Sequence, residues 1–164
     1  MRIGIISDSH GRVERVELAL TKMGKIDALL HAGDYGLGVR EIEYPCPVYF
    51  VQGNCDVDLH IPYEQLITLA GKRIYLTHGH QYDVKSRLHR LELAAREKEA
   101  DIVVFGHTHQ AYQETANGIL FLNPGSLSRP RDSRGATFGI IEIEGDKTAA
   151  LVMPLLEGEN QFFI

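Results

Sequence analysis

Short apolar runs bounded by turn residues recur along the first two thirds of the chain. Runs of this kind predict β-strands at residues 2–7, 28–31, 48–51 and 102–105. Apolar residues at helical spacing predict a helix from Val13 to Met23, a longer one from Val84 to about Ala100, and a weaker helical segment at 39–42. The strand, helix, strand order predicts parallel strands joined by right-handed crossovers.

Pairs of strands joined by tight turns account for most of the remaining pattern. The predicted pairs are 65–69 with 73–77 around Gly71-Lys72, 111–115 with 119–122 around Asn117-Gly118, and about 137–144 with 148–153 around Gly145-Asp146. The tail after Leu156 is left without an assigned element. Antiparallel pairs are therefore expected beside the parallel strands.

Length and composition favour about one domain, which we expect to span residues 1–164. The 17 Lys and Arg against 22 Asp and Glu give a formal charge of −5, which argues against bulk electrostatic binding to nucleic acid or to an anionic membrane. The sequence shows neither a signal peptide nor a membrane helix, and 2 cysteines are too few for a disulfide framework. We therefore expect a cytoplasmic protein.

Residues that can bind a metal ion or a phosphate follow most of the predicted strands. They are Asp8 and His10, Asp34, Asn54, His78, His107 with His109, and Asn123. In open α/β sheets the loops at the carboxyl ends of the strands face a common crevice, so we expect these side chains to meet. The alternative, that the histidines are turn residues satisfied by backbone contacts, is disfavoured by their number and order. His31 lies inside an apolar run and is expected to be a hydrogen-bonded core residue.

The chemistry of this set points to transition metals. Without Asn123, it supplies four imidazoles, two carboxylates and one amide. A mixed nitrogen and oxygen set suits Mn²⁺, Fe or Zn²⁺ better than the all-oxygen shells of Ca²⁺ and Mg²⁺. Seven ligands exceed the need of one ion, whereas two ions about 3.5–4 Å apart would use them if one carboxylate bridges. Such pairs of ions activate a water in hydrolysis and stabilise the leaving oxygen.

Five short motifs in a fixed order connect this set to a known family. Asp8-Ser9-His10, Gly33-Asp34, Gly53-Asn54, His78-Gly79-His80 and Gly106-His107-Thr108-His109 resemble the signature of the calcineurin-like metallophosphoesterases. The short chain and the later Asn123-Pro124-Gly125-Ser126 resemble the small YfcE-type phosphodiesterase branch. The resemblance implies an α/β fold, a double β-sandwich of two facing mixed sheets flanked by helices in four α-β-β-α layers.

The same resemblance implies a role for each matched residue. One divalent ion would be held by Asp8, His10, Asp34 and His109, and a second by Asp34, Asn54, His78 and His107. Asp34 would bridge the two ions, and hydroxide between them would attack the phosphorus of a small phosphodiester. The expected cofactors are two divalent ions, Mn²⁺ first, with Fe, Zn²⁺ or Ni²⁺ as alternatives. The small branch also implies a homodimer or a higher homo-oligomer.

Cys55 departs from the family pattern. Many members carry a histidine there, which is thought to protonate the leaving group or to contact the phosphate. A thiol makes a weaker hydrogen bond than imidazolium, so the change favours substrates with good leaving groups. The expected catalytic set is Asp34, Asn54, Cys55 and His80, although His80 could instead support a neighbouring ligand. Asp56 is expected to orient a neighbouring ligand or loop.

An arginine-bearing loop supplies candidates for substrate binding. Arg129 and Arg131 follow Asn123 in a loop expected near the metals. Guanidinium forks suit phosphate oxygens, so one of these arginines is expected to anchor the part of the substrate that does not react. The open alternatives are a solvated surface run of arginines, and an Asn123 that shapes its turn rather than positions phosphate.

Several other functions are compatible with part of this interpretation. A phosphomonoesterase, a pyrophosphatase or a nucleotide hydrolase would use the same metal site with another substrate. A non-catalytic protein-interaction scaffold, as in eukaryotic sorting-complex relatives of the small branch, would not need the metal ligands. All seven matched ligand positions are retained here, which favours the enzyme. Neither a membrane nor a long nucleic acid is expected as a partner.

Overall fold

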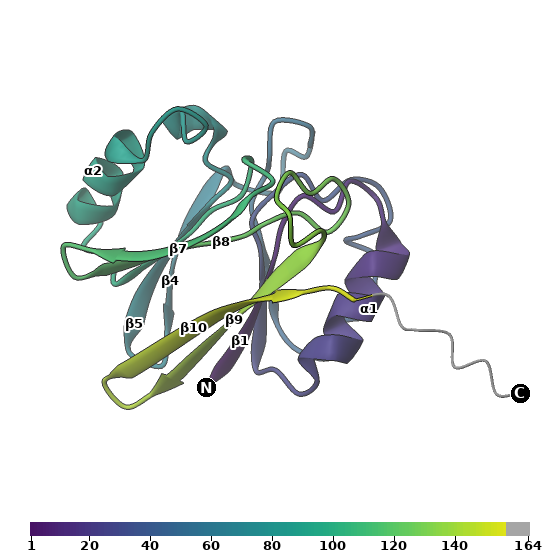
Figure 1. The fold of residues 1–164 in the computed structure, drawn as a ribbon, viewed down its shortest axis with the longest axis horizontal. Coiled ribbons are helices and arrows are strands. Elements are labelled where there is room, and N and C mark those ends of the chain that lie inside the picture. The colour runs from purple at the N-terminus through teal and green to yellow at the C-terminus, as the bar shows by residue number, and fades with distance from the viewer. Residues whose placement is uncertain (157–164) are drawn as a thin grey trace, which may run out of the picture.

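Two five-stranded sheets face each other in the computed structural model, which describes residues 1–156 (Figure 1). One sheet has the strand order β10-β9-β1-β2-β3 and the other the order β4-β5-β6-β8-β7. The strands are β1 (Arg2–Ile6), β2 (Ala28–His31), β3 (Val48–Phe50), β4 (Glu64–Leu69), β5 (Lys72–Thr77), β6 (Ile102–Val104), β7 (Ala111–Ala116), β8 (Ile119–Pro124), β9 (Thr137–Glu144) and β10 (Lys147–Pro154). The helices are α1 (Val13–Met23), α2 (His89–Glu97) and the short 3₁₀ helix η1 (His80–Tyr82).

Each sheet contains three neighbouring parallel strands. In the first sheet β1 pairs with β2 and β2 with β3, and in the second β5 pairs with β6 and β6 with β8. The outer pairs β9–β10, β4–β5 and β7–β8 are antiparallel. Both sheets are therefore mixed, and each brings the carboxyl ends of three parallel strands to one edge.

Three apolar clusters hold the layers together. Ile5 and Leu30 of the first sheet pack against Leu76 and Val104 of the second, and all four side chains are fully buried. Full burial of such a side chain stabilises the fold by roughly 1.5–3 kcal/mol. Helix α1 covers the outer face of the first sheet and α2 that of the second, on opposite sides of the molecule (Figure 1). The prediction of a double β-sandwich flanked by helices is confirmed.

The helix predicted from Val84 to about Ala100 is wrong in its first five residues. Asp83 adopts a left-handed conformation (φ 55°), which ends η1, and turns follow it until α2 begins at His89. Val84 is nevertheless buried in the same apolar cluster as α2. Its helical spacing in the sequence therefore reflects packing on the sheet rather than continuous helix.

The weak helix predicted at 39–42 is also wrong, because this segment forms turns. Val39 is buried in the cluster beneath α1, which accounts for its apolar character. Gly36 and Gly38 both have positive φ values and bend the chain just before it. Among residues 1–156, no helix is long and apolar enough to cross a membrane.

Candidate metal centre

The predicted metal ligands lie at the carboxyl ends of the parallel strands of both sheets. Asp8 and His10 follow β1, Asp34 follows β2, and Asn54 follows β3; in the second sheet, His78 follows β5 directly, and His107 and His109 follow β6. The two edges meet, since the His78 ring lies 2.7 Å from the carbonyl oxygen of Ala32 after β2. The sandwich therefore brings together loops separated by about a hundred residues.

Four of these residues form a compact group. One ligand atom from each of Asp8, His10, Asp34 and His109 lies within 4.8 Å of the others. His109 Nε2 is 3.0 Å from Asp8 Oδ1, and His10 Nε2 is 3.9 Å from Asp34 Oδ2. Two carboxylates and two imidazoles at this spacing fit one divalent transition-metal ion.

A second group of donors adjoins Asp34. His78 Nε2 is 3.5 Å from Asp34 Oδ2, and the centroids of the His78 and His107 rings are 5.0 Å apart. His80 lies beside them, with its ring centroid 5.5 Å from that of His78. The exposed Asn54 amide donates to Cys55 Sγ (3.4 Å), so its position supports the predicted second set less directly than the histidines do.

Buried polar atoms without partners show where an ion would fit. Asp8 Oδ1, His10 Nε2 and His78 Nε2 are buried and have no hydrogen-bond partner among the described residues. Leaving a buried polar atom unsatisfied costs about 1–3 kcal/mol. His10 Nε2 and His78 Nε2 each lie 4.0 Å from Asp8 Oδ1. Bound cations would satisfy these atoms, so the residues present fit a metal site.

Backbone carbonyls fix the orientation of two imidazoles. His78 Nδ1 lies 2.7 Å from the Ala32 carbonyl oxygen, and His109 Nδ1 lies 2.7 Å from that of Arg129. A carbonyl oxygen can only accept, so both Nδ1 atoms carry the proton. In the neutral form of each ring, Nε2 then has a free electron pair directed into the centre, as a metal ligand requires.

Five of the predicted ligands have an unusual backbone conformation. Asp8, His10, Asp34, His107 and His109 all have positive φ values, between 45° and 69°. This left-handed region is uncommon for residues other than glycine, and strain of this kind is concentrated at functional sites. The tight bends turn the chain at the end of each strand and direct the side chains toward one point.

Two glycines that precede ligands are required by close packing. A Cβ atom on Gly53 would collide with the Asp34 carboxylate, and one on Gly106 would collide with the Ser7 hydroxyl. A Cβ atom on Gly106 would also lie only 2.8 Å from Asp8 Oδ2. The Gly-Asn and Gly-His pairs of the sequence therefore have a steric explanation.

The surroundings of Asp34, His10 and His107 favour the forms of these groups that bind metals. Burial opposes ionisation of Asp34, but His78 and the Cys55 N–H outweigh it and hold the pKa of this carboxyl well below its usual range. Burial lowers the pKa of His10, and burial together with His78 lowers that of His107 to about 4. Ionised carboxylates and neutral imidazoles are the ligand forms of these groups.

Serine hydroxyls that the sequence interpretation missed hold Asp8 in place. Ser7 donates to Asp8 Oδ2 (2.6 Å), and Ser126 and Ser128 donate to the Asp8 carbonyl oxygen (2.9 and 2.8 Å). The sequence offered one signal for these serines, since Ser126 is the last residue of the Asn-Pro-Gly-Ser motif.

Asp56 accepts hydrogen bonds from the N–H groups of residues 35, 36 and 53, which confirms its predicted role in orienting loops.

The arginines of the loop after β8 differ in their surroundings. The positive charge of Arg129 adds to burial in lowering the pKa of His10 and acts against burial on that of Cys55. The N–H of Arg131 donates to the His109 carbonyl oxygen (2.9 Å). Arg134 donates to Asp132 and to the Ala111 carbonyl oxygen. For this arginine, the structure favours the alternative of a solvated surface residue.

Asn123 and His31 are buried structural residues. The Asn123 amide donates to Gly106 and Thr108 and accepts from the Gly125 N–H, with no exposed surface. These bonds favour the turn-shaping role over the predicted contact with phosphate. His31 is fully buried and its Nε2 lies 2.8 Å from Ser9 Oγ, which confirms the prediction of a hydrogen-bonded core residue.

Comparison with known proteins defines the class to which this fold and site correspond. A model of the calcineurin-like phosphoesterase superfamily domain matches residues 1–146. The chain belongs to this superfamily, and the resemblance predicted from its motifs is confirmed.

Individual relatives support the same assignment. The probable metallophosphoesterase YsnB of Bacillus subtilis (strain 168) is 37% identical over 147 residues, which cover 89% of this chain and 86% of the relative. Phosphodiesterase YfcE of Escherichia coli (strain K12) is 34% identical over 103 residues, 58% of this chain and 52% of YfcE. The crystal structure of a predicted phosphoesterase from Streptococcus pneumoniae TIGR4 superposes with a TM-score of 0.81 at 32% identity, covering 94% and 89% of the two chains. The prediction of a metal-dependent phosphoesterase is confirmed at this level.

Proposed function

We propose that this protein hydrolyses small phosphodiesters at a centre of two divalent ions. Asp8, His10, Asp34 and His109 would hold one ion, and Asp34, Asn54, His78 and His107 the other. When bound, such ions, with Mn²⁺ as the first candidate, activate a water and neutralise charge on the phosphoryl oxygens.

The observation that carries this proposal is the position of the Asp34 carboxylate. His10 Nε2 and His78 Nε2, which belong to the two different groups, lie 3.9 and 3.5 Å from the same oxygen, Oδ2. The other oxygen, Oδ1, accepts the Cys55 N–H (2.8 Å). Because one carboxylate faces both groups, it is suited to bridge two ions.

The chain's own residues would supply orientation and charge. The hydrogen bonds at His78 Nδ1 and His109 Nδ1 keep the opposite ring nitrogens free, and the serine hydroxyls keep Asp8 aimed at the centre. Arg129 brings a positive charge to the side of His10 and Cys55, where it would bind an oxygen of the phosphate that does not react. Arg131 and His80 remain predicted substrate contacts.

Cys55 is poorly suited to full proton donation. Burial and the Asp34 carboxylate raise the pKa of its thiol, so the neutral form persists at neutral pH. A neutral thiol is a weak hydrogen-bond donor. We therefore expect fast turnover only for esters whose leaving group needs little protonation.

Phosphomonoester, pyrophosphate and nucleotide hydrolysis remain the enzymatic alternatives, since they would use the same ligands. The non-catalytic scaffold is disfavoured by the buried unpartnered atoms, which such a role would not need. The identity of the ions as Mn²⁺, a single domain over residues 1–164, a cytoplasmic location and a homo-oligomeric assembly stay predictions.

The test is turnover of bis(p-nitrophenyl) phosphate in Mn²⁺ by the wild type and by Asp34→Ala. Removing the shared carboxylate is expected to lower kcat by at least about a thousandfold, because both ions and their charge stabilisation depend on it. Asp146→Ala, an exposed aspartate in the β9–β10 turn, is the matched control and should keep full activity. Wild-type turnover in Asp34→Ala would reject the mechanism.

A further inference from the structure

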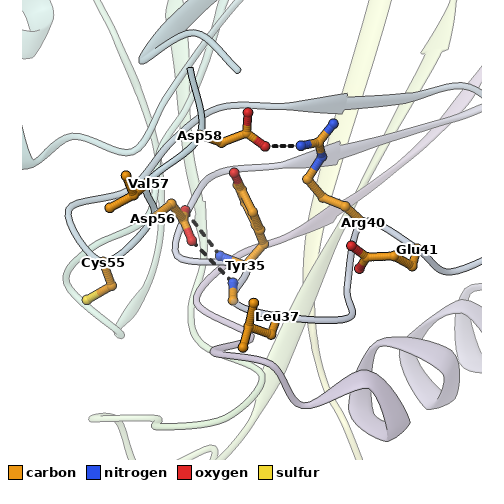
Figure 2. Close-up of a pocket in the computed structure, with 9 residues that line it drawn as sticks. Tyr35, Leu37, Arg40, Glu41, Cys55, Asp56, Val57 and Asp58 are labelled. Atoms are coloured by element: carbon orange, nitrogen blue, oxygen red, sulfur yellow. Dashed lines mark hydrogen bonds and ion pairs between the residues drawn. The ribbon is translucent and has the colours of Figure 1, made fainter. Parts of the chain in front are cut away.

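A pocket outside the metal ligands lies between the loops that follow β2 and β3 (Figure 2). Its volume is about 210 Å³, and it is lined by Tyr35, Gly36, Leu37, Arg40, Glu41, Cys55, Asp56, Val57 and Asp58. An apolar cavity of about 150 Å³ holds one benzene ring. The pocket therefore has room for a single aromatic ring with a small substituent.

The pocket adjoins the metal centre directly. Tyr35 follows Asp34 in the chain, and the Cys55 N–H donates to Asp34 Oδ1 (2.8 Å). The Tyr35 carbonyl oxygen accepts the N–H of Gly11, the residue after His10 (2.7 Å). Tyr35 and Cys55 are thus hydrogen-bonded to residues of the loops that carry the predicted ligands, which places the pocket beside these loops.

The charges around the pocket disfavour an anion. Glu41, Asp56 and Asp58 contribute three carboxylates and Arg40 one guanidinium. Arg40 is already paired with Asp58, as Figure 2 shows, so its positive charge is compensated. A second phosphate placed here would face the remaining carboxylates without an uncompensated cation among the lining residues.

The remaining surface suits a neutral ring. Leu37 and Val57 line the pocket from the two loops and are 93% and 96% exposed, so each has apolar surface available for burial. The Tyr35 side chain points toward the Arg40–Asp58 pair (Figure 2).

We propose that this pocket binds one uncharged, ring-sized ester group of the substrate and discriminates against substrates that carry a second phosphate beside the reacting one. The inference rests on the proposed function, because it assumes that a phosphate ester occupies the metal centre. It favours diesters of aryl alcohols over pyrophosphate and nucleoside polyphosphates. Leu37 and Val57 would set affinity for the ring, and Glu41 would set the preference for neutral groups.

Binding of non-hydrolysable phosphonates to the Mn²⁺-loaded protein tests this assignment by calorimetry, without turnover. The wild type should bind phenylphosphonate about tenfold more tightly than methylphosphonate, because the ring buries apolar surface on Leu37 and Val57. The double variant Leu37→Ala/Val57→Ala should reduce this preference to less than about twofold. Leu59→Ala is the matched control, since Leu59 is 98% exposed in the same loop as Val57 but does not line the pocket.

Charge discrimination is tested with 4-carboxyphenylphosphonate, which adds a negative charge to the same ring. The wild type should bind it more weakly than phenylphosphonate, and Glu41→Gln should recover part of the loss. Glu43→Gln, which changes an exposed glutamate of the same loop outside the pocket, should not. Equal affinity of the wild type for phenyl- and methylphosphonate, or an unchanged ring preference in the double variant, would overturn the assignment. A protein that shows the ring preference but hydrolyses no phosphate ester would overturn the proposed function alone.

Discussion

Aspartates lie at both ends of the sheets, and the two groups differ in burial and in partners. At the amino ends, Asp27 before β2 and Asp101 before β6 are exposed and accept single backbone N–H groups, of Arg2 (2.6 Å) and Arg73 (2.7 Å). At the carboxyl ends, Asp8 and Asp34 are buried, 0% and 2% exposed, and face several imidazoles. Aspartate side chains therefore hold loops by hydrogen bonds at one edge and face a candidate ion site at the other.

Packing around glycines differs between the two edges in the same way. The loops at the carboxyl ends pack without space for a Cβ at Gly53 or Gly106. The Asn117-Gly118 turn at the opposite edge is an ordinary hairpin in which Asn117 also has a positive φ (52°), but a Cβ on Gly118 would meet nothing within 4 Å. Tight packing around the candidate ligands, and not backbone conformation alone, therefore distinguishes the carboxyl edge.

Among the variants that test this contrast, Gly106→Ala should have the largest effect. The new methyl group would displace the Ser7 hydroxyl and the Asp8 carboxylate, and with them His107, so activity should fall more than about a hundredfold and stability by roughly 2–4 kcal/mol. Turnover assays and thermal unfolding measure the two losses. Gly118→Ala, strained only by its positive φ, should cost about 1 kcal/mol and leave activity intact. Equal activity of the two variants would remove the distinction between the edges.

A smaller effect is expected from pH. Burial alone would lower the pKa of His78, but Asp34 and Asp8 outweigh it and raise this pKa above the ordinary value near 6.5, so an ion must displace a proton. The apparent affinity for Mn²⁺ should fall about tenfold per pH unit as pH drops below about 6.5, and activity should be lost below about pH 6. Titration calorimetry in matched buffers measures the affinity. Undiminished metal occupancy at pH 4.5 would contradict histidine ligation.

The smallest effect concerns the amino edge. Asp101→Ala removes one exposed hydrogen bond to the Arg73 N–H and should lower the free energy of unfolding by about 1 kcal/mol. Because Asp101 lies at the edge opposite the ligands, kcat and KM should stay within experimental error of the wild type. A loss of activity comparable to that of Asp34→Ala would show that the two edges are coupled.

Most of the fold and the places of the candidate metal ligands could be predicted from sequence because both depend on strand ends. Each candidate follows an apolar run, so the positions of Asp8, Asp34 and His78 follow once the strands are recognised. The start of α2 could not be predicted, since Val84 keeps helical spacing while Asp83 adopts a left-handed φ. The role of Asn123 depends on partners distant in sequence, and the pocket depends on how two irregular loops meet.

Metal content per chain tests the central claim most directly. Purified wild-type protein loaded with Mn²⁺ and freed of excess ion should hold two equivalents by elemental analysis, Asp101→Ala should also hold two, and Asp34→Ala should hold fewer than about one. One shared carboxylate facing both groups of histidines predicts this result. Two equivalents retained by Asp34→Ala, or none bound by the wild type, would contradict it.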